Sequence, residues 1–138
     1  MIQLQEREYG PDSSPDEIAA IEARLTMIRP GIVMYREVPV PSPFQIGVFA
    51  DRLRRLTEGL DSYDMIMDLS GARPPGKRAR EALRELFGGA RGLRRVAVFT
   101  GKNFIIDGIA RMLLKGSGVR DLTMCKDEAS ALAALGAT

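Results

Sequence analysis

The chain has 138 residues, of which 45% are apolar, one is cysteine and none is histidine. This length and apolar content suffice for the core of one ordinary domain without disulfides or metals. A lone Cys125 and the lack of histidine exclude an internal disulfide, a cysteine-rich zinc cluster and Ser-His-Asp or Cys-His catalysis. We therefore expect a protein that is not an enzyme, with no catalytic residues, metal or cofactor.

The charges are unevenly distributed, although the net charge is only +2. Residues 1–28 carry six acidic and two basic side chains, whereas residues 73–95 carry eight basic and two acidic ones. We divide the chain into an acidic N-terminal segment, 1–19, and a folded domain, 20–138. The acidic segment is either a flexible tail or a cover over the basic middle of the chain.

The sequence also predicts where the protein resides. The N-terminus lacks the basic-then-apolar pattern of a signal peptide. No apolar run approaches the roughly 18 to 20 residues that a transmembrane helix requires. We expect a cytoplasmic protein without a transmembrane segment.

The segment before residue 32 is compatible with two structures. Residues 14–17 form a capping box, and apolar side chains from 18 to 28 fit one face of a helix. Residues 21–27, however, also alternate between apolar and polar as a strand does. We favour a short helical turn near 15–19, followed by a strand that Arg29-Pro30-Gly31 turns back along the next one.

From residue 32 onward, strands and helices alternate. Short runs rich in Val, Ile and Met predict strands at 32–38, 63–69, 94–99 and 119–124. Helical periodicity and capping signals predict helices at 43–58, 76–88, 103–115 and 127–135. This order predicts an α/β fold with a mainly parallel sheet of four to five strands, one antiparallel strand at the N-terminus, and right-handed crossovers.

The stretch GARPPGKR, residues 71–78, spells most of a phosphate-binding P-loop between a strand and a helix. Arg78 occupies the position where a P-loop needs a Ser or Thr to bind Mg²⁺. Pro74 and Pro75 lack the N–H groups that would wrap the phosphates. A nucleotide-binding protein is therefore the least favoured of the functions considered.

Three segments resemble parts of the STAS domain family, most closely its SpoIIAA-like branch, also described as STAS/SEC14-like. YDMIMDLSGA (63–72) resembles the central strand, LRRVAVFTGKN (93–103) the next strand and its turn, and DEASALAAL (127–135) the closing helix. The resemblance covers residues 20–136. It implies a regulatory, non-catalytic module that binds a protein partner, as the bacterial anti-sigma-factor antagonists of this family do.

Family members that act as phospho-switches carry an Asp-Ser pair at the start of the helix after the central strand. The corresponding positions here fall near Gly76, Lys77 and Arg78, which have no hydroxyl group. The resemblance thus implies that the usual phosphoserine switch is absent. Ser70 is the nearest hydroxyl, and we favour a bond to the local turn over phosphorylation for this weak candidate.

Two surfaces are candidates for binding. Loops after adjacent parallel strands share one edge of a sheet, where ligands of such folds bind. The candidate residues for a protein partner or an anion at this edge are Arg73, Lys77, Arg78, Lys102 and Asn103. In segment 76–88, Lys77 and Glu81 are spaced to form an ion pair along a helix. Because the segment carries both basic and acidic side chains, we favour a solvated helix over a surface that binds nucleic acid.

The second surface is helix 103–115, which is apolar around most of its circumference and is therefore expected to be buried on more than one side. Its candidate residues are Phe104, Ile105 and Met112. We favour a core helix that also forms a homodimer contact. The alternative is a groove or patch for a lipid or another small apolar or anionic ligand.

Overall fold

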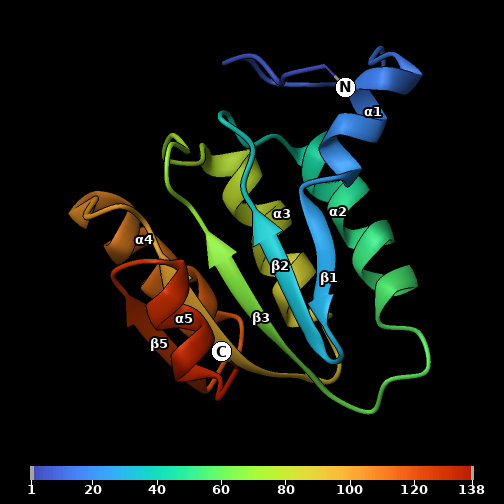
Figure 1. The fold of residues 1–138 in the computed structure, drawn as a ribbon. Coiled ribbons are helices and arrows are strands. Elements are labelled where there is room, and N and C mark those ends of the chain that lie inside the picture. Colours follow the sequence, from blue (N-terminus) through green and yellow to red (C-terminus); the bar gives the residue numbers. More distant parts are fainter. Residues whose placement is uncertain (1, 138) are drawn as a thin grey trace.

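A five-stranded sheet in the order β1-β2-β3-β4-β5 organises the chain (Figure 1). The structure is a computed structural model that describes residues 2–137. The strands are β1 (Leu25–Arg29), β2 (Ile32–Arg36), β3 (Tyr63–Asp68), β4 (Leu93–Phe99) and β5 (Asp121–Cys125). Only β1 and β2 are antiparallel, and their register shifts between Met27 and Arg29. The predicted α/β class and mainly parallel sheet are confirmed.

Five helices cover the two faces of the sheet. They are α1 (Pro15–Glu22), α2 (Pro43–Leu56), α3 (Lys77–Gly88), α4 (Phe104–Gly116) and α5 (Glu128–Ala134). Because the strands follow one another in sequence order, right-handed crossovers place α2, α3 and α4 on the same face. The short helix α5 lies on the other face (Figure 1). Within residues 2–137, none of the helices combines the length and apolar content needed to cross a bilayer.

The core is divided unequally by the sheet. The larger part lies under α2, α3 and α4, where Tyr35 contacts Phe49 edge to face with ring centroids 4.9 Å apart. The smaller part lies under α5, where Ala131 and Leu135 pack against Ile66 of β3. One face of the sheet is therefore thickly covered and the other only in part.

The N-terminal segment begins with a helix and continues as a strand, as predicted, but the helix is longer than expected. It extends to Glu22, and β1 starts only at Leu25. Ile21, completely buried, points into the core from the helix rather than from a strand. Before the helix, Tyr9 is also buried, and its carbonyl oxygen accepts a hydrogen bond from the Ser42 hydroxyl at 2.8 Å.

Ser42→Ala is expected to destabilise the protein more than Ser14→Ala. Both serines form capping boxes, but Ser42 is buried and also bonds to the Tyr9 carbonyl, whereas Ser14 is exposed. Losing a cap costs about 1 kcal/mol, and a buried carbonyl left without its donor costs about 1–3 kcal/mol more. Urea unfolding of the two variants measures the difference, and equal losses would contradict the role given to Ser42.

Candidate functional site

Two turns meet at the carboxyl edge of the sheet. One follows β3, over residues 69–76, and the other follows β4, over residues 100–103. A Cβ atom added to Gly101 would lie 3.5 Å from the Cβ atom of Ser70, so the turns are in contact. Figure 1 shows both at the same end of the sheet. This is the edge at which ligands of parallel α/β sheets bind.

The turn after β3 does not form a phosphate cradle. The N–H of Ala72 donates to the Leu69 carbonyl at 3.2 Å, and that of Arg73 donates to the Pro39 carbonyl at 2.9 Å. The next two residues are prolines and have no N–H group. All four positions between the glycines of the P-loop spelling therefore lack an amide free to bind phosphate.

Lys77 and Arg78 begin helix α3 and are exposed. The N-cap, Gly76, supplies no side-chain cap to the first amide groups of the helix. Within residues 2–137 neither cation forms an ion pair, so the Lys77–Glu81 pair expected from the sequence is not formed. The start of α3 thus presents fixed positive charge to solvent.

The other three residues predicted to bind a partner or an anion at this edge differ in the contacts they already make. Arg73 donates to Glu6 at 2.8 Å, so the acidic N-terminal segment reaches the basic middle of the chain at this point. Asn103 is the N-cap of α4, and its side-chain oxygen accepts from the Ile106 N–H at 3.1 Å. Lys102 is exposed within the turn after β4. The structure places all five candidates on one edge, but Arg73 and Asn103 already have intramolecular roles.

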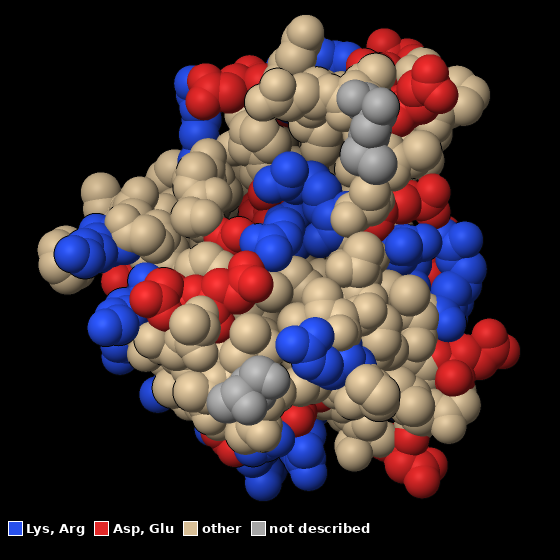
Figure 2. All heavy atoms as spheres, viewed as in Figure 1, with Lys and Arg blue, Asp and Glu red and all other residues tan. Residues whose placement is uncertain are grey.

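Helix α4 exposes its most apolar end. Phe104 is 85% exposed, Ile105 69% and Met112 56%. The opposite side of the helix is buried through Ile106, Ala110, Leu113 and Leu114. The expectation that α4 is buried on more than one side is wrong for the single chain, because the sheet and α3 contact only one side. In Figure 2 the surface projects at the left, where Figure 1 places α4, and is mostly tan with Lys or Arg groups near its tip.

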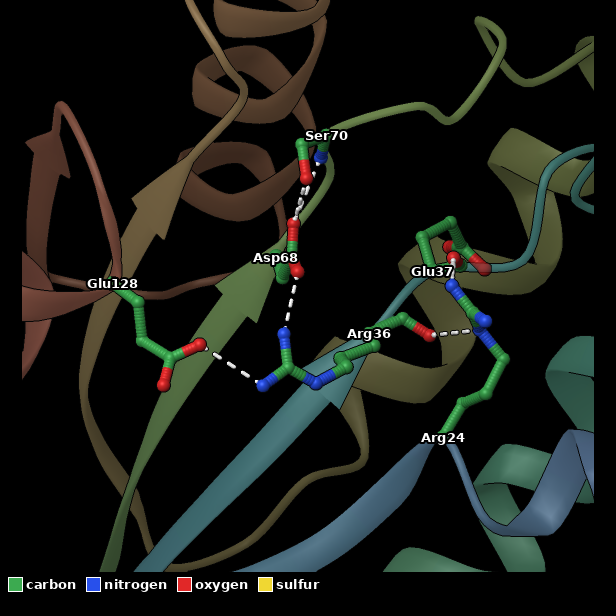
Figure 3. Close-up of polar contacts among 6 residues, drawn as sticks. All are labelled: Arg24, Arg36, Glu37, Asp68, Ser70 and Glu128. Atoms are coloured by element: carbon green, nitrogen blue, oxygen red, sulfur yellow. Dashed lines mark hydrogen bonds and ion pairs between the residues drawn. The ribbon is translucent and has the colours of Figure 1, made fainter.

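A charged network joins β2, β3 and α5 near the turn after β3 (Figure 3). Arg36 donates to Asp68 at 2.6 Å and to Glu128 at 2.9 Å. The Ser70 N–H donates to the same carboxylate, Asp68, at 3.0 Å, and the Ser70 hydroxyl also contacts it. Ser70 therefore bonds to its local turn, as favoured from the sequence. Figure 2 shows acidic and basic groups interspersed over this face.

Glu37 is a buried carboxylate immediately after β2. It is 4% exposed and accepts hydrogen bonds from the Tyr35 hydroxyl at 2.7 Å, the Val38 N–H at 2.9 Å and the Gln45 amide at 3.0 Å. Burial raises its pKa above the ordinary value, although the three hydrogen bonds act in the opposite direction. Arg24 binds the Arg36 and Glu37 backbone carbonyls and not the carboxylate itself (Figure 3).

A small cavity lies beside Glu37 at the same edge. Its volume is about 40 Å³, and its wall is almost entirely apolar, formed by residues that include Met67, Leu69, Leu83, Phe87, Ile106 and Leu113. Sites for small molecules usually measure roughly 300–1,000 Å³. The cavity is therefore too small for a lipid chain in this conformation.

Comparison with known proteins does not assign the chain to a family. Neither the protein-family models nor the curated proteins contain a match to the chain. Within residues 2–137, acidic and cysteine side chains are nowhere grouped in threes as a metal site requires.

Sequence analysis missed the residues that organise this edge, namely Arg36, Glu37 and Glu128. One signal was available for Glu37, because Tyr35 and Glu37 are two residues apart and so point to the same face of an extended chain. Gln45, which completes the capping box of α2, lies on the helix that follows. The Arg36 network gives no such signal, because Arg36 and Glu128 are 92 residues apart.

Glu37→Gln is expected to change how stability depends on pH. The folded-state pKa of Glu37 lies above 4.5, so the native state binds this proton more tightly than the unfolded chain does. The contribution of Glu37 to stability is thus fully present below pH 4.5 and is lost as the pH rises through the folded pKa. The unfolding free energy of the wild type minus that of Glu37→Gln, from urea titrations, should therefore fall as the pH rises above 4.5.

Asp64→Asn is the matched control with the opposite sign. Burial would raise the pKa of Asp64, but hydrogen bonds from Arg95 and Arg94 outweigh burial and hold it below 3.8. This contribution is present above pH 3.8 and is lost as the pH falls through the folded pKa. If the difference for Glu37→Gln instead stays constant or rises with pH, the assigned environment of Glu37 is wrong.

Proposed function

We propose that this chain is a non-catalytic regulatory module of STAS type that binds a protein partner through the carboxyl edge of its sheet. The docking face consists of Lys77, Arg78, Lys102, Phe104, Ile105 and Met112. It combines the basic start of α3 with the exposed apolar side of α4. The partner is expected to bring acidic groups that face an apolar centre.

The exposure of Phe104 and Ile105 is the observation that carries this proposal. Two large apolar side chains that are 85% and 69% exposed, next to one another at a helix start, cost free energy in water unless a partner covers them. Interfaces are built around such aromatic and aliphatic anchors, with charges at the rim. The neighbouring cations form a positively charged rim. Such a rim steers an acidic partner toward the face and disfavours partners of the wrong charge.

The network around Asp68 supports a binding role over a chemical one. Asp68 is held by Arg36 and Ser70, and Glu37 is buried behind three hydrogen-bond donors. The Ser70 hydroxyl contacts Asp68, but this carboxylate is already paired with Arg36, which makes it a weak base for activating a nucleophile. Both carboxylates instead fix the turn that precedes Lys77 and Arg78.

A second candidate is an anionic membrane surface. Lys102, in the turn before α4, and Arg111 and Lys115 on α4 are exposed around the apolar residues. The acidic Asp107 is engaged by the Thr100 hydroxyl at 2.7 Å. Apolar side chains flanked by cations are typical of segments that lie in the interface of a bilayer. The small cavity beside Glu37 does not favour a lipid bound inside the protein, so only the surface mode is proposed.

Phe104→Ser with Ile105→Ser is expected to abolish partner binding. Truncating central anchors of an interface typically weakens binding by at least about 30-fold. Affinity capture with wild-type protein identifies the partner, and titration of the purified pair measures the loss. Lys77→Glu with Arg78→Glu should also weaken binding, more strongly at low salt than at high salt.

Leu60→Ser is the matched control, since Leu60 is also an exposed apolar residue, at 41%, but lies in the turn between α2 and β3. It should leave binding unchanged. Flotation with vesicles that contain or lack anionic lipid separates the two candidates. A captured partner that binds the Phe104/Ile105 variant as tightly as the wild type would overturn the docking face.

A further inference from the structure

A second hollow lies at the opposite, amino edge of the sheet, where helices α2 and α3 end and β3 begins. Its volume is about 320 Å³. The floor is apolar and is formed by Ala50, Leu53, Leu86 and Ala90. This volume falls within the usual range of roughly 300–1,000 Å³ for small-molecule sites. The docking face plays no part in it.

Tyr63 supplies the polar group of this hollow. The residue is the first of β3, is 3% exposed and lines the hollow from the sheet side. Its N–H donates to the Gly92 carbonyl at 2.8 Å, but within residues 2–137 its hydroxyl forms no hydrogen bond. Every fully buried side-chain oxygen or nitrogen of the described residues has a partner. The Tyr63 hydroxyl must therefore reach open space, and the hollow is the space that the residue lines.

The Tyr63 hydroxyl can donate a hydrogen bond to a molecule that occupies the hollow. Burial raises the pKa of Tyr63 to about 12, so the oxygen keeps its proton at neutral pH. Because the hydroxyl reaches open space, water can bond to it in the free protein, and a ligand that displaces this water without offering an acceptor loses that bond. A ligand that enters the hollow gains most if it brings an acceptor atom to this position.

The charges around the hollow are close to balance. Arg54 and Arg91 stand at the rim with Glu85, and Arg54 is already paired with Asp51 at 2.7 Å. The carboxyl ends of α2 and α3 add partial negative charge to the same region. Neither an anion nor a cation is therefore favoured over an uncharged molecule.

We propose that this hollow binds an uncharged, largely apolar small molecule that carries one acceptor oxygen. The apolar body packs on Leu53 and Leu86, and the oxygen accepts the hydrogen bond of the Tyr63 hydroxyl. Aromatic or cyclic ketones have this chemistry. The site is independent of the docking face, because the two lie at opposite ends of the sheet.

Acetophenone and ethylbenzene test the proposal as a matched pair. The two molecules differ at one position, where acetophenone has a carbonyl group and ethylbenzene has a methylene. Titrations followed by amide NMR shifts should place both molecules at Leu53, Leu86 and Ala90. Tyr63→Phe should lower the affinity for acetophenone by about 2- to 12-fold, which is the usual effect of losing one hydrogen bond. The affinity for ethylbenzene should stay unchanged. The variant should stay folded, since the hydroxyl has no partner in the described chain.

Benzoate serves as the charged control and should bind more weakly than acetophenone. The proposal is overturned if neither neutral molecule shifts the amides of the hollow. It is also overturned if Tyr63→Phe affects acetophenone and ethylbenzene equally, or if benzoate binds best. Because none of these outcomes involves Phe104 or Lys77, failure here leaves the proposed docking face untouched.

Discussion

The carboxyl edge of this protein depends on where the Glu37 carboxylate is held. Its donors come from β2 through Tyr35, from the chain just after the strand through Val38, and from α2 through Gln45. The backbone N–H of Glu37 donates to the Asp68 carbonyl at 3.0 Å, which extends the pairing of β2 with β3. A single buried residue thus ties a strand end to its neighbour and to the next helix. The turn after β3, which leads to the proposed docking face, starts immediately beyond this hydrogen bond.

Burying the Glu37 carboxylate costs free energy. The surrounding hydrogen-bond donors explain why a carboxylate is nevertheless found there. Burial opposes the charged form of Glu37, while three donors that would otherwise be unpaired require an acceptor. An apolar side chain of similar size would leave the Tyr35 hydroxyl, the Gln45 amide and the Val38 N–H without partners. The group is therefore better explained as a specifier of local structure than as a source of net stability.

The sequence predicted the architecture well because strand and helix periods differ and because both capping boxes stand where helices begin. The helix α1 was underestimated because residues 18–28 fit either period, and only the burial of Ile21 inside the core decides between them. The Arg36–Asp68–Glu128 network, and the place of the Tyr63 hydroxyl, which has no partner within residues 2–137, depend on how the completed sheet arranges distant side chains. Their members are up to 92 residues apart, so local patterns carry no information about them.

The two edge strands limit the ways in which this sheet can be recognised. Each is five residues long, β1 ends in a register shift next to Arg29, and β5 begins with the charged Asp121. Short, irregular and charged edges discourage the addition of a strand from another chain. A partner therefore cannot readily extend the sheet through main-chain hydrogen bonds, and recognition depends on side chains. Specificity can then change by single substitutions on the surface while the sheet that carries it stays the same.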